Sequence, residues 1–165
     1  MKKIFAIILL GSIFCNTVKK APFFYLRSLD KKDFFLTAQY DKKRPVVLSF
    51  FATWCMPCRK ELPLLDSLSY LYEDIDFNYL AVGSENKAIK SGDIIKFKND
   101  LNLTQNILVD KYGRVFDKFS PSGSLLPLTI LISADGEILY LTEKFDIETS
   151  IDTLVNELNK ALSEN

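Results

Sequence analysis

The sequence contains no histidine among its 165 residues, and this absence excludes several kinds of chemistry. Without an imidazole the chain cannot form a Ser-His-Asp triad, a Cys-His nucleophile pair or a histidine-containing zinc site. It also lacks the C-x-x-C-H motif for covalent haem attachment. The reactive groups that remain are cysteine, carboxylate, lysine and the backbone.

Cysteine is scarce, and neither sign of charge is in excess. The chain has 3 cysteines, 21 Lys+Arg and 21 Asp+Glu. Three thiols are fewer than the roughly four ligands of a structural zinc site, so we expect no metal. The balanced charge provides no overall field to attract nucleic acid, so we expect no nucleic-acid partner. Hydrophobic residues make up 48%, an ordinary value for a globular protein with a core. The length of 165 residues suggests one domain plus an appendage.

The first 20 residues have the composition of a targeting segment. Lys2 and Lys3 precede an apolar run over 4–14, which has about the length of a signal-peptide core and is shorter than the roughly 20 residues of a spanning helix. We assign 1–20 to a signal peptide or lipoprotein leader and 21–165 to the folded domain. Cys15 is a candidate lipidation site, although Phe14 is bulkier than the residue usual before such a cysteine. A lipid-anchored form, a cleaved soluble form and a retained anchor are all open.

The first half of the domain predicts a strand–helix–strand unit. Two short aromatic runs within 21–36 flank a polar stretch and predict a hairpin. The run 46–51 is almost entirely apolar, as in a strand buried on both faces. Apolar positions at helical spacing predict a helix over 56–73, and 77–82 is the next strand candidate. Such a βαβ unit should have a right-handed crossover.

The second half predicts smaller elements. We expect a helix within 86–102 that is interrupted at Ser91-Gly92, a strand over 106–110 and a short helix over 112–119. Strands over 128–132 and 138–141 flank an Asp-Gly pair, which is a strong hairpin signal.

The C-terminal stretch predicts an amphipathic helix with Asp146 as its N-cap. Its apolar stripe runs from Ile147 to Leu162. Parallel strands, an antiparallel hairpin and a closing helix together predict an α/β fold with a mixed central sheet flanked by helices.

Cys55 and Cys58 lie where the buried strand ends and the next helix begins. Unsatisfied N–H groups and the helix dipole at such a position favour the thiolate, which lowers the pKa of C-x-x-C cysteines to roughly 3.5–7.5. Cys55 is therefore the predicted exposed nucleophile, and Cys58 is the predicted shielded resolving thiol. Pro57 suits the first helical turn. A purely structural disulfide, worth only about 2 kcal/mol in so short a loop, and two unrelated buried thiols are the alternatives.

Residues 50–63, which include the Trp-Cys-Met-Pro-Cys run at 54–58, resemble the active-site segment of the TlpA/ResA-like extracytoplasmic thioredoxins. Residues 21–26 resemble the family's opening strand and 128–138 its late hairpin, with a weaker match between them. The resemblance implies a thioredoxin-like fold with an N-terminal hairpin extension. It also implies thiol–disulfide oxidoreductase activity with no cofactor beyond the cysteine pair.

The same resemblance implies a location and partners. Members of this family work at the outer face of a bacterial inner membrane, and the best-known ones reduce disulfides, often in apocytochrome c during haem attachment. We therefore expect protein disulfide substrates, a membrane thiol–disulfide electron donor and a monomer in a periplasmic or lipid-anchored setting.

Further site residues follow from the resemblance. Pro127 aligns with the family's cis-proline, whose loop packs against the cysteines and offers its backbone to substrate. Leu126 and Leu128 flank it, where the family usually has Thr or Val before the proline and Thr after it. Trp54, Pro57, Leu126 and Pro127 are the expected substrate contacts.

Glu61 aligns with a family acid near the resolving cysteine, and its spacing from Cys58 places both on one helix face. A partly buried carboxylate there could shuttle a proton and raise the pKa values of the thiols. The alternative is an exposed acid that complements the helix dipole. Ser49 occupies the position where cytoplasmic thioredoxins carry a buried Asp, which favours the extracytoplasmic branch.

Three other functions compete with a reductase. An oxidase or isomerase would use the same cysteines, because redox poise depends on the helix environment. A thiol peroxidase is disfavoured, since no proline and threonine frame Cys55 as a peroxidatic cysteine. A redox-inactive binding module or metallochaperone is the remaining alternative, although copper-carrying relatives usually have a histidine.

Overall fold

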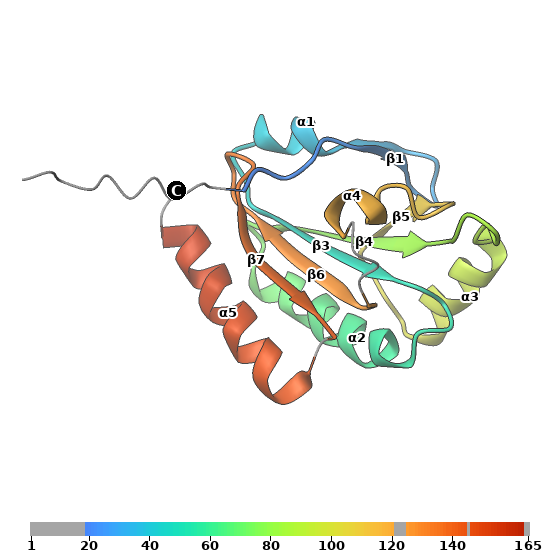
Figure 1. Cartoon of the computed structure of the whole chain (residues 1–165). Helices are drawn as coiled ribbons and strands as arrows, with labels where there is room; N and C mark the ends of the chain where they lie inside the picture. The colour runs from blue at the N-terminus through green and yellow to red at the C-terminus, as the bar shows by residue number, and fades with distance from the viewer. Residues whose placement is uncertain (1–18, 121–124, 145, 164–165) are drawn as a thin grey trace, which may run out of the picture.

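A computed structural model describes residues 19–120, 125–144 and 146–163. Within them, five strands form a central sheet in the order β5-β4-β3-β6-β7 (Figure 1). Strands β3, β4 and β5 are parallel, whereas β6 runs antiparallel to β3 and β7 antiparallel to β6. The predicted mixed α/β sheet is confirmed. The strand bounds are β3 (Val46–Phe51), β4 (Asp76–Val82), β5 (Asn106–Asp110), β6 (Leu128–Ile132) and β7 (Ile138–Glu143).

Strand β3 lies at the centre of the sheet and is buried along its whole length. Its side chains alternate, so that Leu48 and Phe50 belong to the core on one face while Val47 and Phe51 belong to the core on the other. A nearly continuous apolar run is the pattern that such a two-sided position requires.

Three helices cover one face of the sheet: α2 (Met56–Leu71), α3 (Ser91–Asp100) and α5 (Ile147–Ser163) (Figure 1). Leu62, Ile94 and Leu154, one from each helix, are fully buried in the core on this face. The predicted cap of the last helix is confirmed, because Asp146 Oδ1 accepts the N–H of Thr149 at 3.3 Å.

The other face is covered by the N-terminal hairpin and two short helices (Figure 1). The hairpin consists of β1 (Tyr25–Arg27) and β2 (Asp33–Phe35), which pair antiparallel as predicted. The helices are α1 (Leu36–Tyr40) and α4 (Phe116–Phe119). The sequence did not predict α1, because five residues are too few to show a helical period.

Helix boundaries differ from the prediction at three places. Helix α2 ends at Leu71 rather than at residue 73. Ser91 and Gly92 do not interrupt a helix but form the first turn of α3, where early residues need few intrahelical partners. Helix α4 begins at Phe116 rather than at residue 112, because Gly113 adopts φ +75° in the preceding turn.

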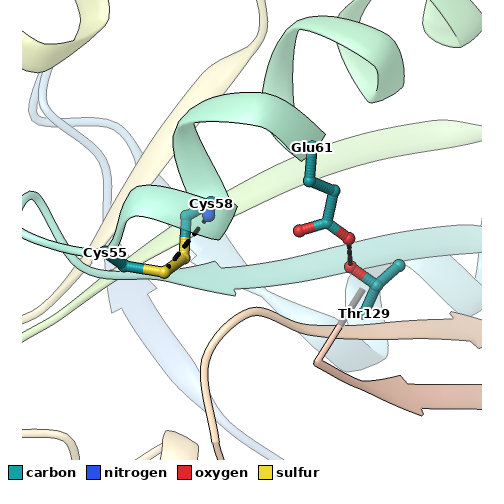
Figure 2. Close-up of a disulfide and its surroundings, with 4 residues drawn as sticks. All are labelled: Cys55, Cys58, Glu61 and Thr129. Carbon is teal, nitrogen blue, oxygen red and sulfur yellow. Dashed lines mark hydrogen bonds between the residues drawn. A yellow bond between two sulfur atoms is a disulfide. The ribbon is translucent and has the colours of Figure 1, made fainter. Parts of the chain in front are cut away.

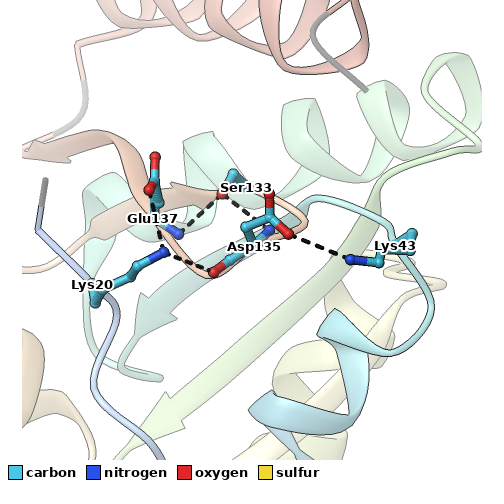
Figure 3. Close-up of polar contacts among 5 residues, drawn as sticks. All are labelled: Lys20, Lys43, Ser133, Asp135 and Glu137. Carbon is cyan, nitrogen blue, oxygen red and sulfur yellow. Dashed lines mark hydrogen bonds and ion pairs between the residues drawn. The ribbon is translucent and has the colours of Figure 1, made fainter.

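The turn between β6 and β7 anchors the start of the described chain (Figure 3). Ser133 Oγ accepts the N–H groups of Asp135 and Glu137, and Gly136 adopts φ +85°. Lys20 Nζ donates to the Asp135 carbonyl at 3.1 Å and to Glu137 Oε1 at 3.2 Å. The predicted leader and Cys15 lie outside the described residues, except for the last two positions of the leader. Among the helices that the structure describes, none is both long and apolar enough to span a membrane.

Candidate active site

Cys55 is the N-cap of α2, directly after the loop that leaves the central strand β3. Its backbone is extended, its N–H donates to the carbonyl of Ala52 at 3.0 Å, and its Sγ accepts the N–H of Cys58 at 3.2 Å (Figure 2). Met56 and Pro57 occupy the first two helical positions, where proline costs no hydrogen bond. The sulfur of Cys55 therefore occupies the place that a capping oxygen usually takes.

Cys55 and Cys58 form a disulfide, with their Cα atoms 5.3 Å apart. Cys58 is fully buried and Cys55 is only 3% exposed. The prediction of an exposed Cys55 is thus wrong for the disulfide form, because its Sγ is bonded to Cys58 and faces that residue's N–H. Of the two, Cys55 is still the cysteine at the helix end, and the side chains beside it are open to solvent.

Those neighbouring side chains are large and apolar. Trp54 is 77% exposed and Met56 is 66% exposed, one on each side of Cys55 in the chain. Pro57 is exposed as well. Large apolar side chains close together at the surface of a folded domain are typical of an interaction site. Met56 was not predicted as a contact, although its place between the cysteines pointed to it.

The peptide bond between Leu126 and Pro127 is cis, as the resemblance implied. Leu128 pairs with Phe50, so this bond lies level with the end of β3, just ahead of the cysteines. Leu126 is half-buried and packs against the core cluster that contains both cysteines. Pro127 is buried, so its ring is not a surface for substrate and only the loop's backbone and the flank of Leu126 remain for that purpose.

Glu61 lies one turn beyond Cys58 on α2 and is completely buried. Thr129 Oγ1, on β6, donates to Glu61 Oε1 at 2.5 Å (Figure 2). Ser49 is the partner of Thr129 across the β3–β6 pair. Among the described residues, Ser49 Oγ and Glu61 Oε2 have no hydrogen-bond partner. The exposed dipole-complementing acid is therefore excluded.

Burial determines the protonation of this carboxyl group. Desolvation raises the pKa of Glu61 to about 7, although the nearby hydroxyls of Thr129 and Ser49 act to lower the pKa. A carboxyl group with such a pKa is partly protonated at neutral pH, so it can both accept and release a proton there. Thr129 was missed from the sequence, because a threonine in an apolar strand has no pattern that links it to a glutamate on a helix.

Over 19–120, 125–144 and 146–163, no three or more Cys, Asp or Glu side chains lie close enough together to hold a metal ion.

A C-x-x-C disulfide that caps a helix after the central strand, beside a cis-proline loop, defines a thioredoxin-like protein. The chain belongs to the AhpC/TSA family, whose family model matches residues 17–141.

Named relatives agree with this class. The thiol-disulfide oxidoreductase ResA of Geobacillus thermodenitrificans is 30% identical over 118 residues, which are 72% of this chain and 64% of that protein. The thioredoxin-like protein YneN of Bacillus subtilis is 33% identical over 99 residues, 58% of this chain and 54% of that protein. The chain thus spans less than two thirds of the length of both. A proposed protein disulfide isomerase from Bacteroides thetaiotaomicron shares the fold, with a TM-score of 0.77, 23% identity and coverage of 88% of this chain and 89% of that one.

Proposed function

We propose that this protein is a thiol–disulfide oxidoreductase that reduces disulfides of other proteins outside the cytoplasm. The observation that carries the proposal is the Cys55–Cys58 disulfide at the N-terminus of α2, bordered by exposed apolar side chains. A structural disulfide would not need that border, since apolar side chains are ordinarily turned into the core. The similarity to ResA, a thiol-disulfide oxidoreductase, supports the same reaction.

The reaction begins from the reduced pair. The Cys55 thiolate attacks one sulfur of a substrate disulfide, which forms a mixed disulfide and releases one substrate thiolate. Cys58 then attacks Cys55 Sγ, releases the second substrate thiolate and closes the disulfide seen in the structure. Two electrons pass from the protein to its substrate, and no further cofactor takes part.

Glu61 serves the second step, in which the buried Cys58 attacks, by accepting the proton of the Cys58 thiol. Cys58 is fully buried, so its thiol needs a nearby base before it can attack. The Glu61 carboxyl, one turn away and with a pKa of about 7, can take that proton as the carboxylate and return it when the pair is reduced again.

The substrate would contact the exposed apolar side chains beside Cys55 and the loop that contains the cis-proline. Trp54, Met56 and Pro57 offer exposed apolar surface beside the nucleophile. The loop at Leu126–Pro127 offers an edge along which an extended substrate segment can lie. An unfolded or loosely folded substrate such as apocytochrome c, before haem attachment, suits such an open edge.

The proposal also includes export from the cytoplasm and a partner that reduces the cysteine pair again after each reaction. The leader at 1–20 would direct the chain out of the cytoplasm, with Cys15 as the lipid attachment point if the protein is anchored. The pair would be returned to its reduced state by a thiol–disulfide donor in the membrane.

The midpoint potential of the Cys55–Cys58 couple tests the proposal. Equilibration of the purified protein with glutathione buffers of graded ratio, followed by alkylation and mass spectrometry, gives the reduced fraction at each potential. A reductant should have a midpoint below about −200 mV, in the range of thioredoxin and the glutaredoxins. A value near −120 mV would show an oxidase instead.

A further inference from the structure

Two hydroxyl side chains on neighbouring strands face the carboxyl group of Glu61 from the sheet. Thr129 on β6 and Ser49 on β3 are direct partners across the antiparallel pair, so both point toward the face that α2 covers. Both side chains are fully buried, as is Glu61. Figure 2 shows Thr129 Oγ1 directed at Glu61 Oε1, to which it donates at 2.5 Å. The carboxyl group is thus enclosed between a helix and two strands that carry hydroxyls.

The packing of the core does not explain these two hydroxyls. The other residues of β3 and β6 are apolar, and a buried hydroxyl that makes no hydrogen bond loses its hydration without compensation. Among the described residues, Ser49 Oγ and Glu61 Oε2 both lack a partner. Apolar side chains of the same shape can be as stable or more stable at such a site. The hydroxyls therefore serve a purpose other than stability.

A hydroxyl group can both donate and accept a hydrogen bond, because its hydrogen rotates to suit the neighbour. An ionised carboxylate only accepts, whereas a protonated carboxyl group also donates. A lysine or arginine here would only donate and would favour the ionised form. Thr129 already donates to Oε1, and the Ser49 hydroxyl lies near the same carboxyl group. The Ser49 hydroxyl can therefore donate to an ionised Oε2 or accept the O–H of a protonated one.

We propose that Thr129 and Ser49 are positioning residues that keep Glu61 in place beside Cys58 in both of its protonation states. The proposal rests on the proposed function and adds two residues to its proton transfer. When Cys58 is activated, its S–H bond breaks, an O–H bond forms on Glu61, and the sulfur keeps the electron pair with which it attacks Cys55 Sγ. The two hydroxyls rotate and lose no proton themselves. The carboxyl group can thus change its charge without changing its position.

Two tyrosines and Cys58 are the titratable groups that act on Glu61 from the surrounding elements. Tyr79 on β4 and Tyr140 on β7 interact with it electrostatically, and burial raises the pKa of both phenols, so both are neutral near pH 7. Glu157 on α5 acts on Tyr140 and is not among the groups that shift the pKa of Glu61. Burial raises that pKa, and the two hydroxyls act to lower it. Removal of either hydroxyl should therefore raise it further.

Ellman's reagent separates the two steps of the reaction. The reduced protein releases one thionitrobenzoate when Cys55 attacks the reagent, and a second when Cys58 attacks Cys55 Sγ and closes the disulfide. Stopped-flow absorbance gives the rate constant of the second phase from about pH 5 to about pH 9, which spans the titration of a carboxyl group with a raised pKa. Cys15 is replaced by Ala in every protein, so that Cys55 and Cys58 are the thiols that react.

Thr129→Val removes the hydroxyl and keeps nearly the same shape. Its second phase should have a midpoint at least about one pH unit above that of the wild type and be roughly tenfold slower at pH 7, because Glu61 is then ionised less readily. Ser49→Ala should shift the midpoint in the same direction. Thr129→Ser keeps the hydroxyl and should restore the wild-type midpoint. Thr153→Val is the matched control, since Thr153 is exposed on α5, and its profile should follow the wild type.

A second measurement does not depend on the reaction. The infrared carbonyl band of the protonated carboxyl group, identified by its absence in Glu61→Gln, follows the titration of Glu61 in the oxidised protein, and its midpoint should also rise in Thr129→Val. Superimposable titrations of wild type and Thr129→Val would overturn the positioning role. Equal slowing in Thr129→Ser and Thr129→Val with unchanged midpoints would overturn it too. If the wild type released a single thionitrobenzoate with no second phase, the proposed function would fail as well.

Discussion

Glu61 is a carboxyl group that the fold removes completely from solvent and supplies with a single hydrogen bond, from Thr129. An ionised carboxylate in such a place loses hydration that the nearby hydroxyls of Thr129 and Ser49 do not replace, so the protonated form is favoured. A structural acid would ordinarily be given a cationic partner or several donors. The described residues instead leave Oε2 without a partner, which is compatible with the proton transfer that we propose for this group.

The raised pKa of Glu61 predicts a pH-dependent stability of the disulfide form. Between pH 4.5 and about 7 the folded state holds a proton that the unfolded state has lost, so stability falls as pH rises through this window. The loss amounts to about 3 kcal/mol in total. Glu61→Gln should remove this part of the pH dependence. The free energy of unfolding of the variant, relative to that of the wild type, should therefore rise by about the same amount between pH 4.5 and pH 8.

Urea unfolding of the oxidised protein measures this difference, because the disulfide cysteines do not titrate in that form. Glu73→Gln serves as the control, since it changes an exposed glutamate just beyond the end of α2. Its stability should follow the wild type at every pH. Parallel curves for wild type and Glu61→Gln would show that the carboxyl does not titrate in the proposed window.

The two cysteines should differ in their roles although both are buried in the disulfide. Cys55 caps the helix and is flanked by exposed Trp54 and Met56, whereas Cys58 is one turn inside. After reduction, Cys55 should therefore react with iodoacetamide at neutral pH at least roughly tenfold faster than Cys58. Cys58→Ser should accumulate a mixed disulfide with substrate.

Non-reducing electrophoresis and intact mass detect the trapped complex. The matched control is Cys55→Ser, which leaves Cys58 as the one thiol of the pair and should trap no substrate through it; both variants are made with Cys15 replaced by Ala. Equal trapping by both variants would contradict the assigned order of attack.

At the scale of elements, the junction of β3 and α2 could be predicted from the sequence because its determinants are local. An apolar run specifies the buried strand, and Pro57 with the helical spacing that follows specifies where the helix begins. The same holds for the hairpin at Gly136 and for the cap at Asp146.

Features that depend on contacts between distant segments could not be predicted. The Thr129–Glu61 hydrogen bond joins residues 68 positions apart, and neither residue type signals the other. A hollow beside Trp54 arises from three loops that meet only in the folded sheet. Ser91-Gly92 was misread for a related reason, since small residues suit a helix start as well as a break and tertiary packing decides between them.

The closeness of the loops after β4 and β5 depends on Gly83. A Cβ at this position would lie 2.0 Å from the Lys111 carbonyl oxygen and 2.8 Å from the Ile89 nitrogen. Gly83→Ala should therefore push the two loops apart and destabilise the domain by about 1–3 kcal/mol, as overpacking usually does. Gly92→Ala is the matched control, because a Cβ there meets no atom within 4 Å and alanine is the better helix former.

Chemical denaturation of both variants measures these effects. Gly92→Ala should be neutral or more stable by up to about 1 kcal/mol. If Gly83→Ala unfolded at the same denaturant concentration as the wild type, the loops would have room that the structure does not show.

At the scale of the whole molecule, two hydrophobic cores lie on opposite faces of the sheet, and different elements cover them. The helices α2, α3 and α5 make the core that surrounds the cysteines, whereas the N-terminal hairpin, α1 and α4 make the core on the opposite face. The hairpin is thus a layer of the domain and not an appendage to it. Because β3 contributes to both cores, loss of the hairpin layer would also loosen the strand that holds the active site.

Replacing Phe24 tests how much the hairpin layer contributes to the stability of the domain. It is 1% exposed and its ring contacts those of Phe34 and Phe119, at centroid distances of 5.7 and 5.9 Å. Phe24→Ala should lower the free energy of unfolding by about 3–5 kcal/mol, since it leaves a cavity between the hairpin and α4. The adjacent Phe23 is 56% exposed, so Phe23→Ala removes the same side chain from the surface and should change stability by no more than about 0.5 kcal/mol. Urea unfolding of the two variants compares them under one condition, and equal losses would mean that the hairpin does not close the second core.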